Sequence, residues 1–454
     1  MRFVKLAAAT AAFAAAGLLA ACGGSGSGSH AQVRLLNASA GYASLDLTIN
    51  STSVDTGVAF GSAGSYGSVD VSNLTTQFLS NGTAVYNTTP TLAGGDTYTL
   101  IAYGWQGGVS YKTLQENQTA PASGSASLLV LNLAPDAGTV DTYFVPANTP
   151  CNATTLLSGT SISLGLIGGA GSGYVPTTAG TYGVCIVGTG NTSDVRLTIP
   201  SITLASASVN TLIITPTTGG VLVNGIFVVQ GGSATPFYTS NARVRVVGSV
   251  PGTSATTPST ISGSLTSSTG TANLLGTTSA VMPTIGNYQI VPAGAGNVVN
   301  LSVNGTALST LTMPTMAPGG DYTVLVTGAP GATSTAVLTD DNRLPLTAGY
   351  AKMRLVNGSS DPNASLSMSL DFTTIATNVT PGTASTFTLV PSDTTGSTSE
   401  ITVLTPTPTT NGYAFDKSGL TIVSQGVYNV YLLANSSATF QNYDYMQGII
   451  VRER

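Results

Sequence analysis

The stretch that decides the fold runs from Ala126 to Pro146 and reads ASLLVLNLAPDAGTVDTYFVP. An apolar alternating run is followed by a break at Asn, Pro and Gly and then by a second alternating run, which is the pattern of strand, turn and strand. Three other segments are imperfect copies of this stretch, and they begin at Ala31, Ala242 and Ala351. Their recurrence roughly every hundred residues predicts a tandem array of β units.

Later landmarks fix the boundaries of the unit. Each opening segment is followed by an aromatic residue that begins another short run, at Tyr66, Tyr174, Tyr288 and Phe387. Each unit then closes on an apolar strand, at 97–103, 209–214, 322–326 and 428–433. The chain therefore divides into four predicted units, 31–124, 125–236, 241–347 and 348–454. Similar acidic junctions after units one and three, LQEN and TDDN, indicate a duplicated pair, with the joint between the pairs at 231–240.

The alternation within the units predicts sandwiched sheets. In unit one Leu45, Leu47 and Ile49 alternate with polar residues, so one face of that strand can pack on a partner sheet while the other meets water. In unit three Val244 and Val246 are expected to point inward, and Arg243 and Arg245 outward. We predict an all-β fold of tandem immunoglobulin-like antiparallel β-sandwich units.

Three phrases carry a family resemblance: LNLAPDAGTVDTYFVP, GSGYVPTTAGTYGVCI and TDDNRLPLTAGYAKMRLVN. They resemble the domain-of-unknown-function family 4397, which occurs in bacterial envelope proteins and often in lipoproteins. The resemblance runs over most of the chain after the first thirty residues. It is strongest in unit two and weakest in unit three, where 249–279 is a Ser/Thr/Gly-rich insertion. It implies a β-sandwich module on the cell envelope and supplies no catalytic residues.

The N-terminal segment has the pattern of a secretion signal. Arg2 and Lys5 precede an uncharged Ala/Leu-rich run that is too short for an ordinary spanning helix. The run ends in LAAC, which resembles the bacterial lipobox, so 1–21 is the predicted lipoprotein signal peptide and Cys22 the predicted lipidated residue. The alternative is a secreted protein without lipid, in which Cys22 merely lies near the cleavage site.

Lipidation at Cys22 would anchor the protein without spanning the membrane. Each buried methylene contributes about 0.8 kcal/mol, so two or more acyl chains, palmitate among them, hold a protein on a bilayer. Gly23 stands where an Asp would indicate retention in the inner membrane, which favours the outer membrane. Residues 22–30 form a Gly/Ser tether, and the single histidine, His30, is interpreted as a linker residue at its end.

Two further cysteines lie in unit two. Cys151 and Cys185 are the thiols that remain once Cys22 carries lipid, and in an oxidising compartment we expect them to form a disulfide. The alternative is a free redox pair or a metal site. It lacks CxxC spacing and a neighbouring histidine.

Composition narrows the possible functions. The chain is 42% hydrophobic with 54 glycines, typical of a folded, turn-rich β protein, and only 7% of its residues are charged. Its outer faces must therefore be built largely from Thr, Ser, Asn and Gln. The net charge of -5 argues against nucleic acid as a partner, since that needs a clustered basic face.

The sequence offers little for catalysis. A lone histidine on a tether cannot serve a Ser/His/Asp or Cys/His site, and the 18 acidic residues are scattered without an evident pair for glycoside hydrolysis. We expect no enzyme activity, no cofactor and no metal. Asp340, Asp341 and Asn342 could offer oxygen ligands to calcium, with Glu116 and Asn117 as a weaker counterpart. A solvated turn or a cap is the expected interpretation of that segment.

Aromatic residues are the candidate ligand contacts. Trp105 lies among glycines and could be an exposed ring that stacks on sugar, or it could close the end of a sandwich core. Tyr443 and Tyr445 near the C-terminus carry the same two interpretations. The expected function is non-catalytic surface display, adhesion or ligand binding, with the membrane, envelope proteins or glycans as partners. The alternatives are an assembly component without a small ligand and, third, a carboxylate-dependent glycan hydrolase.

Overall fold

The computed structural model describes residues 29–72, 74–157, 162–166, 171–254, 256–276, 278–359, 365–405, 414–434 and 446–454. Their backbone is almost entirely β, with one short α-helix, α1 (Ala153–Leu156), and one 3-10 turn, η1 (Pro135–Ala137). The strands form eight sheets that face each other in pairs around four separate hydrophobic cores. The all-β sandwich class predicted from the sequence is confirmed.

Each unit has an inner sheet, which contains the opening strand, and an outer sheet. In the first unit the inner sheet is ordered β4 (Gly67–Asp70), β1 (His30–Ala38), β7 (Thr97–Trp105), β8 (Gly108–Gln115), and the outer sheet β3 (Thr52–Ala59), β2 (Ser44–Ile49), β5 (Thr76–Ser80), β6 (Thr83–Thr88). In the second the inner sheet is β12 (Val175–Thr178), β9 (Ser125–Asn132), β15 (Val209–Pro216), β16 (Val223–Val229), β17 (Ala234–Phe237), and the outer sheet β11 (Ile162–Leu166), β10 (Val140–Pro146), β13 (Gly180–Gly188), β14 (Asn191–Leu204).

The third and fourth units follow the same plan. In the third the inner sheet is β22 (Thr284–Ile285), β18 (Asn241–Gly248), β27 (Asp321–Ala329), β28 (Ala332–Asp340), with β23 (Gln289–Pro292) also on β18; the outer sheet is β20 (Gly270–Asn273), β19 (Thr260–Ser267), β24 (Val298–Val303), β25 (Thr306–Ala307), with β21 (Ala280–Val281) on β19 and β26 (Leu311–Thr312) on β24. In the fourth the inner sheet is β32 (Thr383–Ala384), β29 (Tyr350–Gly358), β36 (Val427–Ala434), β37 (Met446–Arg452), with β33 (Thr388–Pro391) also on β29; the outer sheet is β31 (Thr373–Val379), β30 (Leu366–Leu370), β34 (Ser399–Leu404), β35 (Phe415–Leu420).

One strand pair in each inner sheet is parallel, which refines the antiparallel prediction. The opening strand pairs in parallel with the closing strand in all four units: β1 with β7, β9 with β15, β18 with β27 and β29 with β36. A parallel pair needs a long crossover connection. Here the strands of the outer sheet lie between opening and closing strand and provide that connection.

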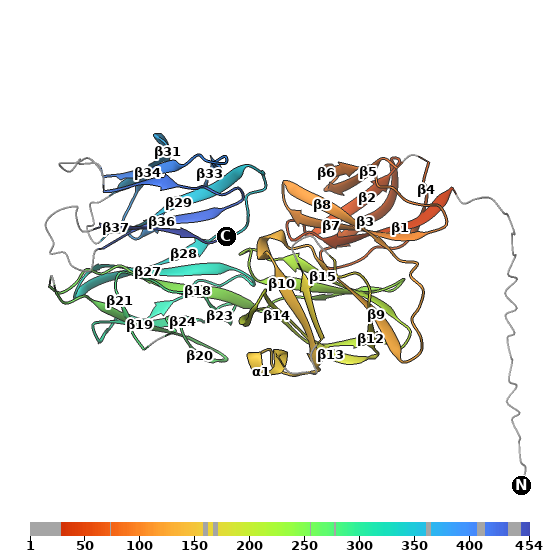
Figure 1. The fold of residues 1–454 in the computed structure, drawn as a ribbon, viewed down its shortest axis with the longest axis horizontal. Coiled ribbons are helices and arrows are strands. Elements are labelled where there is room, and N and C mark those ends of the chain that lie inside the picture. Colours follow the sequence, from red (N-terminus) through yellow and green to blue (C-terminus); the bar gives the residue numbers. More distant parts are fainter. Residues whose placement is uncertain are drawn as a thin grey trace, which may run out of the picture.

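The inner sheets pack on each other in pairs. Leu36 and Ile101 of the first unit share a buried cluster with Leu129, Leu131 and Ile213 of the second. In the same way Val247 and Leu325 of the third unit share one with Val356, Tyr431 and Leu433 of the fourth. The result is two stacks of four sheets that lie side by side (Figure 1). The inner sheets are therefore covered on both faces, whereas outer strands such as β2 alternate buried and exposed residues.

The double coverage changes one prediction about sidedness. Arg245 was expected to point outward, and it does leave its own core, but unit four covers that face and leaves Arg245 only 2% exposed. Within the predicted joint 231–240, Ala234–Phe237 adds strand β17 to the sheet of unit two. The Tyr238 ring then stacks on Phe60 of unit one at 5.6 Å, which fixes this segment on the first pair.

Candidate functional site

Equivalent positions of the four units meet at the inner-sheet interfaces. We number the positions of each opening strand from the alanine that begins the repeated segment, which is Ala31, Ala126, Ala242 or Ala351. The fourth residue in this numbering faces the neighbouring unit, and these residues are Arg34, Leu129, Arg245 and Arg354. In each inner sheet the closing strand is followed by one more long strand: β8, β16, β28 or β37. A polar residue at or just after the end of that strand is paired through its backbone with the closing strand, and these residues are Glu116, Gln230, Asp340 and Glu453. Three units thus combine an arginine with a carboxylate, and unit two combines leucine with glutamine.

In the first pair the ion pair lies within unit one and is shared with unit two. Arg34 Nη2 is 2.9 Å from Glu116 Oε1, and Arg34 Nε donates to Thr99 Oγ1 at 2.8 Å. Arg34 Nη1 also donates to the Gly232 carbonyl at 2.6 Å, while the Gly231 amide donates to Glu116 Oε2 at 2.7 Å. Both charged side chains are almost fully buried, and they bind the backbone of the second unit directly.

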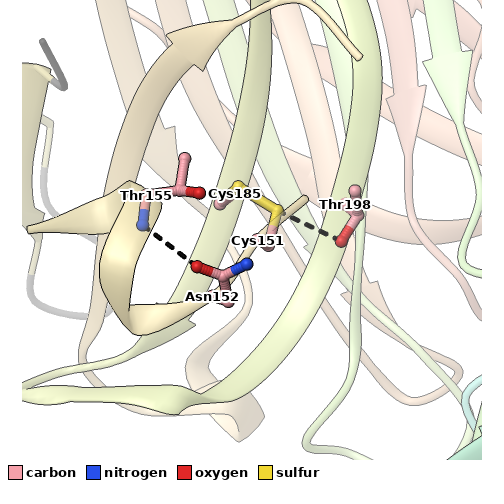
Figure 2. Close-up of a disulfide and its surroundings, with 5 residues drawn as sticks. All are labelled: Cys151, Asn152, Thr155, Cys185 and Thr198. Carbon is pink, nitrogen blue, oxygen red and sulfur yellow. Dashed lines mark hydrogen bonds between the residues drawn. A yellow bond between two sulfur atoms is a disulfide. The ribbon is translucent and has the colours of Figure 1, made fainter. Parts of the chain in front are cut away.

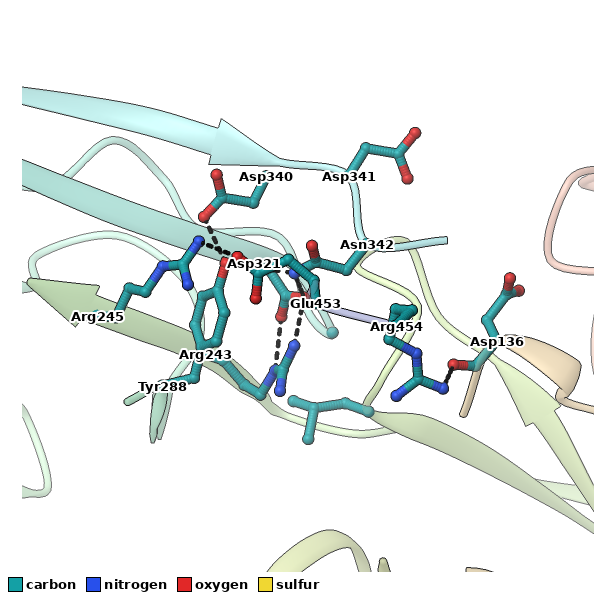
Figure 3. A network of polar contacts seen from close by, with 12 residues as sticks. Asp136, Arg243, Arg245, Tyr288, Asp321, Asp340, Asp341, Asn342, Glu453 and Arg454 are labelled. Carbon is teal, nitrogen blue, oxygen red and sulfur yellow. Dashed lines mark hydrogen bonds and ion pairs between the residues drawn. The ribbon is translucent and has the colours of Figure 1, made fainter. Parts of the chain in front are cut away.

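In the second pair the ion pairs are exchanged between the units. Arg245 of unit three binds Glu453 of unit four at 2.7 Å, and Arg354 of unit four binds Asp340 of unit three. Asp340 also accepts from Tyr288 Oη at 2.7 Å and from Thr323 Oγ1 at 2.6 Å. Figure 3 shows the carboxylates of Asp340 and Glu453 close to Arg245 and Tyr288.

The aromatic landmarks of the sequence cover these arginines. Tyr66 lies over Arg34, Tyr288 over Arg243 and Arg245, and Phe387 over Lys352 and Arg354, at 4.3 to 4.7 Å from cation to ring centre. In unit two Tyr174 instead packs against the apolar cluster that contains Leu129. The recurring aromatic residue therefore has one structural purpose, which is to cover the fourth residue of the opening strand.

Burial raises the pKa of two tyrosines and of one carboxyl group in and beside this cluster. Burial, reinforced by the Glu116 carboxylate, raises the pKa of Tyr66 to about 12. Burial also raises the pKa of Tyr288 well above that of an ordinary phenol, and it raises the pKa of Asp321 although Arg243 opposes this. Asp321 binds Arg243 Nη2 at 2.6 Å and Asn342 Nδ2 at 2.7 Å. The Asp321 carboxylate is thus held by an arginine and an amide of its own unit.

A second contact region joins the two pairs and is centred on Asp136 of η1. Asp136 Oδ2 accepts from Trp105 Nε1 of unit one, and Oδ1 accepts from the Leu344 amide, at the junction of units three and four, at 2.7 Å. The Arg454 guanidinium donates to the Asp136 carbonyl, and the Arg343 guanidinium lies 4.7 Å from the Trp105 ring centre. Burial raises the pKa of Asp136, while its hydrogen bonds from Trp105 and Leu344 oppose the shift.

The position of Trp105 decides between its two interpretations. Its side chain is buried at 7% exposure between unit one, η1 and Arg343, so it is not an exposed ring for stacking on sugar. It is buried, as the second interpretation expected, but against η1 of unit two and Arg343 of the other pair, and it is not a member of the four sandwich cores. No local sequence pattern indicates this role, since the partners lie 31 and 238 positions further along the chain.

The disulfide lies on the outer sheet of unit two. Cys151 and Cys185 are joined with an S–S distance of 1.98 Å and Cα atoms 5.7 Å apart, as the sequence predicted. Cys185 is buried in β13, and Cys151 precedes α1, whose first turn is capped by Asn152 Oδ1 accepting from the Thr155 amide at 3.0 Å (Figure 2). The bond therefore ties the α1 segment to the sheet.

The remaining predicted site residues fall in two groups. Cys22, Tyr443 and Tyr445 lie outside the described residues. Asp340, a possible calcium ligand expected to lie on a solvated turn, is instead buried, and its oxygens accept from Arg354, Tyr288 and Thr323. Within the described ranges no three His, Cys, Asp or Glu residues are grouped as a metal site, and no helix is long and apolar enough to cross a membrane.

The sequence matches a family over its first part. Residues 31–143 match the domain of unknown function DUF4397. This range covers unit one and the opening of unit two, whereas the resemblance by motif is strongest in unit two. No curated protein matches the chain.

The solved structures that match this chain have low sequence identity to it and low TM-scores. A candidate cell adhesion protein from Bacteroides uniformis has 12% identity and a TM-score of 0.22, over 49% of this chain and 99% of its own. One from Bacteroides ovatus has 11% identity and a TM-score of 0.23, over 49% and 98%. The Bacillus anthracis TIE protein has 10% identity and a TM-score of 0.15, over 85% and 65%. Likeness at this level carries no functional argument.

Proposed function

We propose that this chain is a non-catalytic, lipid-anchored protein of the bacterial cell envelope, which presents loops at the ends of a rigid block of β-sandwiches for adhesion or ligand binding. The observation that carries the proposal is the burial of charged side chains in structural contacts between units. Arg34, Arg245 and Arg354 are each less than 5% exposed and bind neighbouring units. A block held in this way keeps its loops at fixed distances from one another, as a display scaffold requires.

The exposure and backbone conformation of one loop residue, Phe372, favour a ligand-binding function for the protein over a purely structural one. Phe372 lies at the tip of the β30–β31 hairpin with 86% of its surface exposed and a φ of 66°. The matching turn of unit one carries Asn50 and Ser51. A bulky residue in the left-handed region costs stability, and an exposed ring gains nothing from the core, so contact with a partner accounts for it best.

The anchor and the exposed face are tested together by protease accessibility. On intact cells that produce the protein, external protease should digest the chain if it faces outward. The Cys22→Ser variant should lose fatty-acid labelling and leave the membrane fraction. Digestion that occurs only after permeabilisation would contradict surface adhesion. It would favour the alternative role as an assembly component, with partners to be found by crosslinking.

The contact residue is tested by replacement. Phe372→Ala should leave the melting temperature unchanged, because the exposed ring adds nothing to the core and alanine keeps the Cβ atom that sets the strain of the turn. It should weaken binding of cells to glycan or matrix surfaces. A suitable control is Val281→Ala, which alters an exposed apolar residue of unit three. Equal binding by wild type and Phe372→Ala would remove this hairpin from the contact surface.

A further inference from the structure

A cavity of about 390 Å³ lies where the end of the chain meets unit two. It is lined by Arg454 together with backbone and side chains of two unit-two segments, 137–139 and 188–196. The charged side chains on its wall are two cations, Arg196 and Arg454, and one anion, Asp194. The cavity is therefore a cationic recess between the two pairs of units.

The charge of Arg196 is already balanced. Its Nε and Nη2 atoms bind Asp194 Oδ2 at 3.1 and 2.7 Å, and its Nη1 atom donates to the Ala137 carbonyl. Gly188 leaves room for this arrangement, because a Cβ atom there would come within 2.6 Å of Arg196 Nη2. Arg196 thus presents an oriented guanidinium edge at the cavity wall.

The charge of Arg454 is not balanced in this way. In the described part of the chain its guanidinium has one hydrogen-bond acceptor, the Asp136 carbonyl, and no carboxylate at ion-pairing distance. The two nearby carboxylates face other donors: Asp136 binds Trp105 and Leu344, and Asp321 binds Arg243 and Asn342. Figure 3 shows Arg454 reaching the Asp136 backbone while the Asp136 carboxylate points away.

The surroundings of Arg454 disfavour the charged form of its guanidinium group. Burial, together with the guanidinium groups of Arg196 and Arg243, lowers the pKa of Arg454 to about 10. A guanidinium offers five N–H donors, and it pairs most strongly with oxyanions in a bidentate geometry. The group that this recess lacks is an anion with several acceptor oxygens.

We propose that the cavity binds a small oxyanion, a phosphate or sulfate group, between the guanidinium groups of Arg454 and Arg196. The bound group would bridge unit four to unit two and so strengthen the contact between the pairs. It can be a free ion or the charged substituent of a glycan. The inference does not rest on the proposed adhesive function.

The test is calorimetric titration of the purified full-length protein with inorganic phosphate, at constant ionic strength in chloride. Wild type should bind phosphate. Arg454→Gln should bind it roughly tenfold or more weakly, because a charge-assisted bidentate contact is lost. The control is Lys112→Gln, which also removes one positive charge; Lys112 is exposed and outside the cavity lining, and the variant should bind as wild type does. Equal unfolding temperatures of the three proteins in chloride exclude a folding defect.

Two results would overturn the proposal: no binding of phosphate by wild type beyond that of chloride, or equal affinity of wild type and Arg454→Gln. A second titration with glucose 6-phosphate distinguishes the source of the oxyanion. Tighter binding than inorganic phosphate supports a glycan substituent, and equal binding supports a free ion.

Discussion

Arg34 occupies the fourth position of the first opening strand, and Leu129 occupies the same position of the second. The partner positions hold Glu116 and Gln230, so one chain contains a charged and an uncharged version of the same contact. Removing one member of a buried ion pair leaves an unpaired charge, whereas replacing both members by well-packed neutral residues is often harmless. The second unit therefore serves as a natural control for the first.

We predict that Arg34→Leu lowers the free energy of unfolding of the first pair by about 3–5 kcal/mol, since it strands the buried Glu116 carboxylate. The double variant Arg34→Leu with Glu116→Gln should recover most of that loss, because it copies unit two. Urea unfolding can be followed by the fluorescence of Trp105, the single tryptophan. If the double variant is as unstable as Arg34→Leu, the stranded charge is not the cause.

At the scale of the element, the disulfide restrains a segment that has little other anchorage. The four-residue helix α1 is too short to be stable by itself, and Leu156 is its one buried residue. The bond closes a loop across a sequence separation of 34. The disulfide therefore stabilises unit two mainly by restricting the conformations of the unfolded chain, and less by adding contacts to the folded one.

We predict that Cys151→Ser lowers the free energy of unfolding of unit two by about 3–4 kcal/mol on the chain-entropy estimate. The double variant with Cys185→Ser should match the reduced wild type. Thermal unfolding with and without a thiol reductant measures both effects. A reductant-dependent change in the double variant would show that the reductant acts elsewhere.

The strands could be predicted from the sequence because they follow a local pattern. The pairing of distant strands and the contacts between units could not, because they join residues far apart in the sequence. The alternation of Leu45, Leu47 and Ile49 is visible in the sequence because the side-chain period of a strand is two. The parallel pairing of β1 with β7 is not visible, because the register between distant strands leaves no local signal. The arginine at the fourth position recurs in three openings, and aligning them with the following carboxylates would have indicated the ion pairs.

At the scale of the whole molecule, the contacts that join the two stacks are mainly polar in the part of the chain that the structure describes. Trp105, Asp136 and Arg343 form one of them, and the Gly219 amide donates to the Gly319 carbonyl at 2.9 Å in another. The apolar clusters, in contrast, lie within units or between the units of a pair. The boundary between the pairs is thus the place where the molecule should open first.

We predict that Trp105→Ala separates the pairs without unfolding them. The change removes the indole that Asp136 and Arg343 hold, and it leaves the buried Asp136 carboxylate one donor short. A compact body of this length has a radius of gyration of about 22 Å, and small-angle scattering should show a larger value for the variant. Phe372→Ala, far from this contact, should scatter as wild type does. An unchanged curve for Trp105→Ala would mean that the hydrogen bonds of Leu344 and Arg454 to Asp136, together with the Gly219 contact, suffice to hold the stacks together.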